Sequence, residues 1–291
     1  MKSAEFRLAV RAGSQEVADR VVAEVWAVGA LGVEEIARGE GVGLIIYLDQ
    51  SCEVAIRGSL EAFSGESVVV GESEAIGEQD WSEAWKEGLE AIVISHRLVV
   101  RPSFVEHTPA PGQREVVVDP GQAFGTGGHE STRLILEWVD VLAENPSPPA
   151  RVLDVGTGSA VLALAALKLG ASSALGFDLD LDAIREARQV SELNGMSGRL
   201  ALFAGPIASL GAGGFDLVLV NLLRSEMIPI ASDIERMLAP GGRLVLSGLL
   251  ESDRPEVLEV FGKLGLESFA ERSLLDGSGA LWISPLLGFK A

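Results

Sequence analysis

The feature that most constrains the fold is the regular alternation of strand-like and helix-like stretches over the second half of the chain. Short apolar runs such as RVLDV (151–155) and FDLVLVN (215–221) are each followed by a stretch with helical periodicity, and the pattern continues to ALWIS (280–284). Strands that alternate with helices predict a parallel sheet wrapped by helices on both faces. We therefore expect an α/β fold with a doubly wound sheet.

The first 70 residues follow a different pattern. EFRLAV (5–10) alternates apolar and polar residues, and the helical run after it carries Val17, Val21 and Val25 at spacings of four. Three further short strands and a weaker helix complete the order βαββαβ, which is typical of a small split α+β domain. We expect this domain over residues 1–70.

An acidic connector is expected over residues 71–112. Within it DWSEAWKEGLEAI (80–92) begins with Asp80, and Glu83 follows three positions later, which is a helix-start signature. The tryptophans of this stretch lie one turn apart, so the helix is expected to pack on a neighbouring domain. The larger domain is then expected over residues 113–291.

Composition limits the partners of the chain. Its 291 residues carry a formal net charge of -19, which repels a phosphate backbone, so no direct nucleic-acid partner is expected and a basic protein suits better. The opening residues show neither a signal peptide nor a spanning helix, so we expect a cytoplasmic protein with no membrane partner. Cys52 is the single cysteine, which rules out an intramolecular disulfide and a cysteine zinc site, and no metal is expected.

The loop after the strand at 151–155 indicates an adenosine-bearing ligand. Gly156 and Gly158 allow close approach of the backbone to a ligand. A dinucleotide loop would carry a third glycine or alanine at position 161, where Val161 stands, and this weakens the alternative of a nicotinamide dehydrogenase. Asp154 would repel a pyrophosphate but attract the methionyl amine of S-adenosylmethionine, directly or through water.

A second carboxylate is expected at the end of the next strand. Asp178, in GFDLD (176–180), can accept hydrogen bonds from both ribose hydroxyls, each worth roughly 1.5–3 kcal/mol. Asp180 fits a turn or helix cap better. Asp154, the glycine loop, Asp178 and FDLVLVN together resemble the class I S-adenosylmethionine-dependent methyltransferases, which implies a Rossmann-like sheet and S-adenosyl-L-methionine as cofactor.

Three stretches narrow the resemblance. DWSEAWKEGLEAI, VVVDPGQAFGTGGHESTRL (116–134) and DLVLVNLL (216–223), in this order, are similar to the methyltransferase family that modifies the N-terminal and lysine amines of ribosomal protein eleven of the large subunit. The resemblance covers nearly the whole chain. It implies that the leading domain recruits this basic ribosomal protein, free rather than assembled, and that a flexible linker joins the two domains.

The resemblance also assigns site residues. It places cofactor contacts at four positions: Thr132, Gly156, Asp178 and Asn221. Three residues of the preceding glycine-rich stretch are expected beside the cofactor, namely Phe124, Gly125 and Thr126, where Phe124 either lines the pocket or anchors its loop. The side-chain carbonyl of Asn221 is expected to orient the acceptor amine without placing a charge beside the sulfonium. His129 is expected to be structural, because the amine can lose its proton to solvent before it binds.

Two residues depart from the family pattern. Ala160 stands where the family has a glycine, and Arg224 stands where a small or apolar residue is usual. If Arg224 faced the acceptor channel, it would disfavour a charged amine, so a divergent paralogue that methylates another protein or a small molecule remains an alternative. A non-catalytic cofactor-binding module is a further alternative, against which Asp178 and Asn221 argue.

Overall fold

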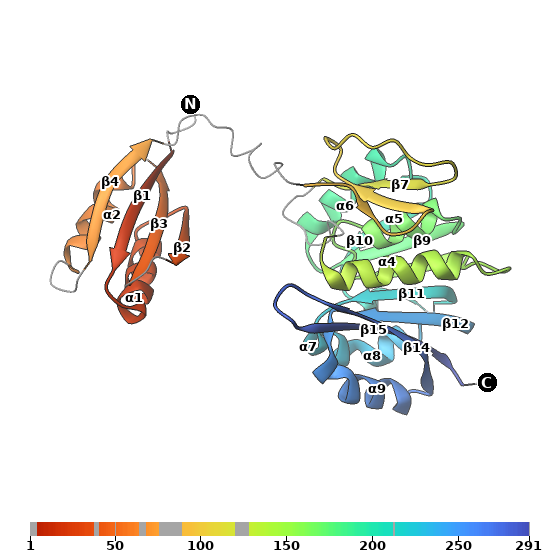
Figure 1. Ribbon diagram of the computed structural model, residues 1–291. Coiled ribbons are helices and arrows are strands. Elements are labelled where there is room, and N and C mark those ends of the chain that lie inside the picture. The colour runs from red at the N-terminus through yellow and green to blue at the C-terminus, as the bar shows by residue number, and fades with distance from the viewer. Residues whose placement is uncertain are drawn as a thin grey trace. The chain divides into compact units, whose positions relative to one another are not determined.

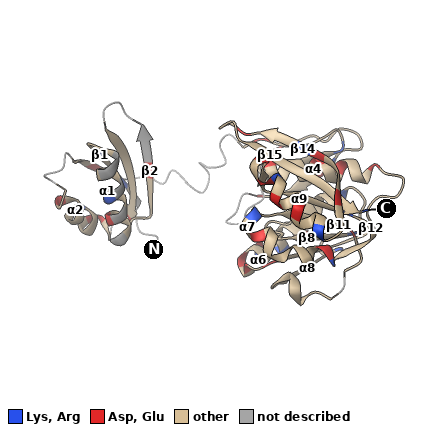
Figure 2. Cartoon of the chain, turned by 90° about the horizontal axis from the view of Figure 1, so that it is seen from below, with Lys and Arg blue, Asp and Glu red and all other residues tan. Residues whose placement is uncertain are grey.

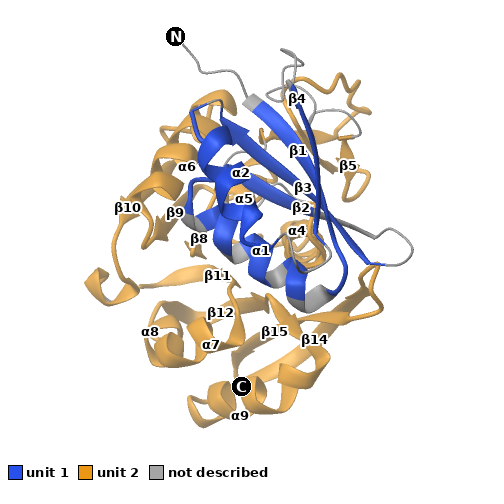
Figure 3. Cartoon of the chain, turned by 90° about the vertical axis from the view of Figure 1, so that its left-hand side faces the viewer, with its two compact units in different colours: residues 1–88 blue, residues 89–291 orange. Residues whose placement is uncertain are grey.

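The computed structural model describes residues 5–37, 41–49, 51–63, 68–75, 89–119, 128–211 and 213–290. The chain divides into two compact units, residues 1–88 and residues 89–291, coloured separately in Figure 3. Each unit contains hydrophobic core clusters of its own. No helix in the described part of the chain is both long and apolar enough to span a bilayer.

Unit 1 is a four-stranded antiparallel sheet with two helices (Figure 1). Its elements are β1 (Glu5–Ala12), α1 (Gln15–Ala27), β2 (Gly32–Ala37), β3 (Val42–Asp49), α2 (Glu53–Glu61) and β4 (Val69–Ala75), and the strand order is β2-β3-β1-β4. Leu8 of β1 and Ile46 of β3 are paired, and both are fully buried with Val21 and Val25 of α1. The alternation in β1 therefore selects the face that the helices cover, and the expected βαββαβ order is confirmed.

Unit 2 is built on an eight-stranded sheet with the order β10-β9-β8-β11-β12-β15-β13, in which β14 also pairs with β15. The strands are β8 (Arg151–Val155), β9 (Ser173–Asp178), β10 (Leu200–Ala204), β11 (Phe215–Asn221), β12 (Leu238–Ser247), β13 (Leu249–Leu250), β14 (Leu266–Leu275) and β15 (Leu281–Phe289). Strands β8 to β12 pair with one another in parallel, whereas β12 and β15 pair in the antiparallel direction. The expected doubly wound sheet is thus confirmed, with β15 antiparallel between β12 and β14.

Helices cover both faces of this sheet (Figure 1). One core cluster joins α4 (Glu130–Ala143), α5 (Val161–Lys168) and α6 (Leu181–Leu193) to the strands. The other joins α7 (Arg224–Met227), α8 (Ala231–Glu235) and α9 (Arg254–Lys263) to the opposite face. Strands β8 and β11 contribute to both clusters, because successive side chains of a strand point to opposite faces.

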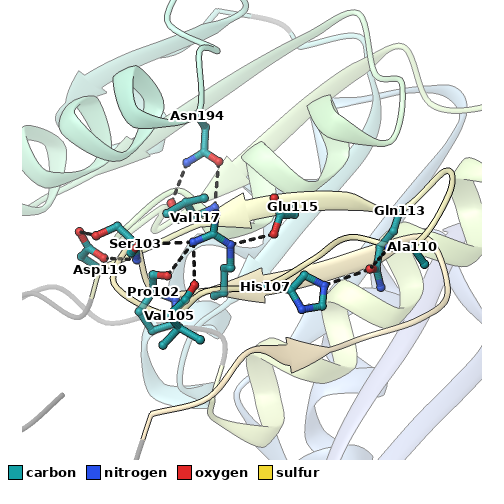
Figure 4. Close-up of polar contacts among 11 residues, drawn as sticks. Pro102, Ser103, Val105, His107, Ala110, Gln113, Glu115, Val117, Asp119 and Asn194 are labelled. Atoms are coloured by element: carbon teal, nitrogen blue, oxygen red, sulfur yellow. Dashed lines mark hydrogen bonds and ion pairs between the residues drawn. The ribbon is translucent and has the colours of Figure 1, made fainter. Parts of the chain in front are cut away.

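A three-stranded sheet precedes α4 and consists of β5 (Ile92–Val93), β6 (Leu98–Arg101) and β7 (Arg114–Val117). Arg101 holds the loop between β6 and β7: its guanidinium pairs with Glu115 at 2.8 Å and donates hydrogen bonds to the carbonyls of Pro102 and Val105. These three partners are labelled in Figure 4. Asp119 accepts hydrogen bonds from the backbone N–H and the hydroxyl of Ser103, at 2.6 and 2.8 Å. These contacts fix the end of β7 relative to β6.

Asn194, at the C-terminal cap of α6, completes the hydrogen bonding of β7 (Figure 4). Its carboxamide accepts a hydrogen bond from the N–H of Val117 at 2.9 Å and donates to the carbonyls of Val117 and Val190 at 2.7 and 2.8 Å. The side chain is almost completely buried. It therefore takes the place of a neighbouring strand on this side of Val117.

Replacing Asn194 by alanine is expected to lower the free energy of unfolding by about 2 kcal/mol, because the change leaves the buried polar groups of Val117 without their partner. Urea unfolding measures this loss. Asn145→Ala, in the exposed loop after α4, is the matched control and should change stability by less than about 0.5 kcal/mol. A loss for Asn194→Ala no larger than that of the control would contradict the role assigned to this carboxamide.

Several elements differ from the sequence expectation. Strands β5, β6 and β14 were not expected, and the helix expected from Ser225 is broken into α7, a 3-10 turn and α8. Most of the expected helix over 80–92 lies outside the described residues, and its last part is not helical, since Leu89 to Ala91 are irregular and Ile92 begins β5. The expected connector, 71–112, contains the end of β4 and all of β5 and β6.

Candidate active site

The carboxyl ends of β8, β9 and β11 meet at the point where the strand order of the sheet reverses. The chain runs outward from β8 through β9 to β10, and then returns to place β11 on the other side of β8. In open α/β sheets, ligands bind beyond the strand ends at such a point. Asp154 in β8, Asp178 at the end of β9 and Asn221 at the end of β11 are therefore brought to one edge of the sheet.

The loop after β8 has a left-handed backbone conformation at three residues, which is unfavourable for residues that carry a Cβ. Gly156 and Gly158 have φ of 67° and 50°, and a Cβ built on Gly156 would lie 2.7 Å from Cδ2 of Leu222. Ala160 also has a positive φ, 65°, although it carries a side chain. The left-handed conformation costs a residue such as alanine roughly 1–2 kcal/mol. The departure from glycine at this position therefore leaves the loop shape intact at a cost in strain.

Asp154 is fully buried and acts as a clamp on this loop. Its Oδ2 accepts hydrogen bonds from the hydroxyl of Thr157 at 2.8 Å and from the N–H of Ala163 at 3.2 Å. Ala163 is in the first turn of α5, whose N-cap residue, Ala160, has no side-chain oxygen. Asp154 therefore satisfies one of the N–H groups that a helix start leaves without a partner. The sequence analysis did not identify Thr157 as a site residue, although its position between Gly156 and Gly158 places it in the ligand loop.

Asp178 is held with its carboxylate in a fixed orientation at the end of β9. Its Oδ2 accepts a hydrogen bond from the N–H of Gly158 at 3.1 Å, and its Oδ1 accepts one from the N–H of Asp180 at 3.0 Å. The side chain is half-buried. Asp180 in turn caps α6, accepting from the N–H of Asp182 at 2.8 Å, as its position suggested. A carboxylate fixed in this way can accept further hydrogen bonds from a diol without reorganising.

Asn221 and Thr132 lie next to each other, although they are far apart in the sequence. The Nδ2 of Asn221 donates a hydrogen bond to the hydroxyl oxygen of Thr132 at 3.1 Å. Thr132 lies in the first turn of α4 and is almost completely buried. Among the described residues, no group donates a hydrogen bond to the Oδ1 of Asn221. The amide is thus anchored through its nitrogen, which leaves its oxygen as an acceptor.

The start of α4 is fixed by three further contacts. His129 is the N-cap residue, and its Nδ1 accepts from the N–H of Ser131 at 3.2 Å while its ring meets Trp282 edge to face at 4.6 Å between centroids. The hydroxyl of Ser247, at the end of β12, donates to the carbonyl of Ser131 at 3.0 Å. His129 thus serves the structural role expected for it. Phe124, Gly125 and Thr126, which lead toward this helix, lie outside the described residues.

Arg224, whose charge raised the question of a different acceptor, is paired with acidic residues. Its Nε lies 3.2 Å from Oδ1 of Asp253, and its Nη1 forms an ion pair with Glu256. Basic and acidic positions are both found on α7 (Figure 2). Two carboxylates offset the guanidinium charge, so Arg224 does not present an uncompensated cation near Asn221.

Fold and site geometry define unit 2 as a class I methyltransferase, with a mostly parallel sheet and a glycine loop and acidic strand ends at its switch point. The model of the ribosomal protein L11 methyltransferase (PrmA) family matches residues 15–272 of the chain. The chain belongs to this family.

Individual relatives agree with the family. A segment of 202 residues is 43% identical to the ribosomal protein L11 methyltransferase of Syntrophotalea carbinolica, and one of 205 residues is 40% identical to that of Geobacter sulfurreducens. These alignments cover 69% and 70% of the present chain and 66% of each relative, just under two thirds of their length. A crystal structure of a ribosomal protein L11 methylase from Lactobacillus delbrueckii subsp. bulgaricus superposes with a TM-score of 0.61 at 27% identity, covering 69% of the present chain and all of that chain.

Proposed function

We propose that this protein transfers methyl groups from S-adenosylmethionine to amines of ribosomal protein L11. Membership of the family supports the reaction and the acceptor. The observation that carries the proposal is the placement of Asp178 and Asn221 at the carboxyl ends of β9 and β11, the strands on either side of β8. Each side chain is oriented by a hydrogen bond from or to a neighbouring element. A net charge of -19 suits a basic acceptor, and the reaction would take place in the cytoplasm.

The residues present fit the cofactor. Gly156, with a φ of 67°, leaves the loop after β8 without a side chain at this position, and the carboxylate of Asp178 is oriented by Gly158 so that it can accept the ribose hydroxyls. Thr132 supplies a hydroxyl at the start of α4, where backbone N–H groups also face polar atoms. We assign cofactor contacts to the residues just named and to Asp154. We also assign them to the segment that contains Phe124, Gly125 and Thr126.

Methyl transfer requires a neutral amine aligned with the methyl carbon. S-adenosylmethionine supplies that methyl on a positively charged sulfur. The Oδ1 of Asn221 would accept a hydrogen bond from the amine N–H, which directs the nitrogen lone pair toward the carbon. The amine that Asn221 orients would take up the methyl and then release one proton to solvent, so the positive charge that it gains in the transfer is lost again. An α-amine with a pKa of about 7.7–8.0 is more readily neutral than lysine at about 10.4.

Intact-mass spectrometry of purified ribosomal protein L11 tests the proposal directly. The acceptor is incubated with this protein and S-adenosylmethionine, and additions of one methyl mass or more, mapped to the N-terminal amine or lysines, are the expected result. An unmodified acceptor, under conditions where calorimetry shows that the cofactor binds, would exclude this acceptor and leave a paralogue with another substrate.

Asn221→Ala is expected to lower kcat about 30-fold while raising the Kd for S-adenosylmethionine less than about threefold, because the amide would act on the amine in the transition state rather than on the cofactor. Steady-state kinetics and calorimetry give the two values. Thr132→Val, which removes the anchor of the amide, should lower kcat in the same direction by a smaller factor. Equal losses in kcat and cofactor affinity for Asn221→Ala would show that the residue only binds the cofactor.

A further inference from the structure

The central carboxyl of the site, Asp154, has an incomplete set of hydrogen bonds. Both of its described partners, Thr157 and Ala163, donate to Oδ2. Oδ1 is buried and has no hydrogen-bond partner among the described residues. An ionised carboxylate that is fully buried with one oxygen unpaired is costly, whereas a neutral carboxyl can carry its proton on that oxygen.

No positive side chain offsets this carboxyl from the strands beside it. Its register partners are Gly176 in β9 and Leu219 in β11, both uncharged, and Ala163 faces it from α5. The charged group that acts on it is a second carboxylate, Asp178. Burial raises the pKa of Asp154 most, the hydrogen bonds from Thr157 and Ala163 lower it, and the charge of Asp178 raises it, which together place the pKa at about 7.

We propose that Asp154 is a proton-exchanging group of the cofactor site: it binds a proton in the empty protein and releases it to solvent when the cofactor binds. The inference rests on the proposed function. S-adenosylmethionine carries positive charge on its sulfur and its amine, and a nearby cation favours the ionised form of a carboxyl. Proton release therefore couples cofactor affinity to pH. From the titration position of Asp154, the Kd of the wild type should rise about tenfold between pH 8 and pH 6.

Isothermal titration calorimetry of the full-length protein with S-adenosylmethionine, in buffers of different ionisation enthalpy, counts the protons released. At pH 7 the wild type should release about half a proton more than Asp154→Asn. The asparagine keeps the acceptor for Thr157 and Ala163 but does not titrate. The cofactor amine, with a pKa of about 7.7–8.0, titrates with both proteins, so the difference isolates Asp154.

Thr157→Val provides a second test that keeps Asp154 in place. The loss of the hydroxyl hydrogen bond should move the midpoint of the pH dependence of Kd upward, because this bond favours the ionised carboxylate. Cofactor binding with equal proton release by the wild type and Asp154→Asn, or an unmoved midpoint in Thr157→Val, would overturn the proposal while leaving the proposed function standing. Absence of cofactor binding by the wild type at every pH would overturn both.

Discussion

Asp154→Asn is expected to raise the free energy of unfolding of the cofactor-free protein by about 3 kcal/mol at pH 8 and to change it little at pH 4. The pKa of this carboxyl is raised from 3.8 to about 7 in the folded protein. Between these values the folded protein holds a proton that the unfolded chain has released, so the stability of the wild type falls as the pH rises through the window from about 4 to 7.

The size of the effect follows from the pKa difference. Each unit corresponds to about 1.4 kcal/mol, and a shift of about three units, which already includes the hydrogen bonds from Thr157 and Ala163, gives roughly 4 kcal/mol. The Nδ2 of asparagine would take the buried position of Oδ1, where it has no acceptor among the described residues, and this lowers the expected gain to about 3 kcal/mol. Asparagine has the same shape and keeps a carbonyl oxygen for both donors. The variant therefore removes the buried charge without removing the cap of α5.

Urea unfolding followed by circular dichroism at pH 4, 6 and 8 measures this pH dependence. Asp216→Asn is the matched control, because the Oδ2 of Asp216 also accepts two backbone N–H groups, those of Ala150 and Arg151, but the side chain is only half-buried. The control should bring no gain at any pH. A wild type and an Asp154→Asn variant whose stabilities run parallel from pH 4 to pH 8 would refute a buried, proton-binding Asp154.

Most helices and strands could be predicted because each is marked by the spacing of apolar residues within its own short segment. The buried parallel strands, such as 215–221, read as continuous apolar runs, and β1 reads as an alternation. Strand β14 gave no such signal, since it is exposed along almost its whole length and pairs with β15 alone. The antiparallel direction of β15 is set by its pairing with β12 and β14, and the order of strands in the sheet cannot be read from the local sequence pattern.

The candidate site also has features that the sequence predicts and features that it does not. Asp178 and Asn221 could be identified because each ends a strand, and the carboxyl ends of parallel strands share one edge of the sheet. The contacts that orient them could not be predicted. The amide of Asn221 is held by Thr132, and Arg224 is neutralised by Asp253 and Glu256, residues distant in the sequence that only the packing of the helices brings together.

Asp178→Ala is expected to raise the Kd for S-adenosylmethionine about 100-fold. Two charge-assisted hydrogen bonds to the ribose hydroxyls would be lost at roughly 1.5–3 kcal/mol each, and about 3 kcal/mol of net loss corresponds to a factor of about 100. The wild-type carboxylate needs little reorganisation to bind the ribose, because the N–H groups of Gly158 and Asp180 already hold its two oxygens. Calorimetry at pH 8, where Asp154 is ionised, measures this loss.

Asp178→Asn separates the charge of this residue from its shape. The amide keeps one acceptor for the ribose, so its Kd should rise only about tenfold. It also removes the negative charge that raises the pKa of Asp154, so the decline of stability with pH should end at a lower pH than in the wild type and reach a smaller total loss. An unchanged decline would show that this charge does not act on Asp154. An Asp178→Ala Kd within threefold of the wild type would remove Asp178 from the cofactor site, whatever the stability of the variant.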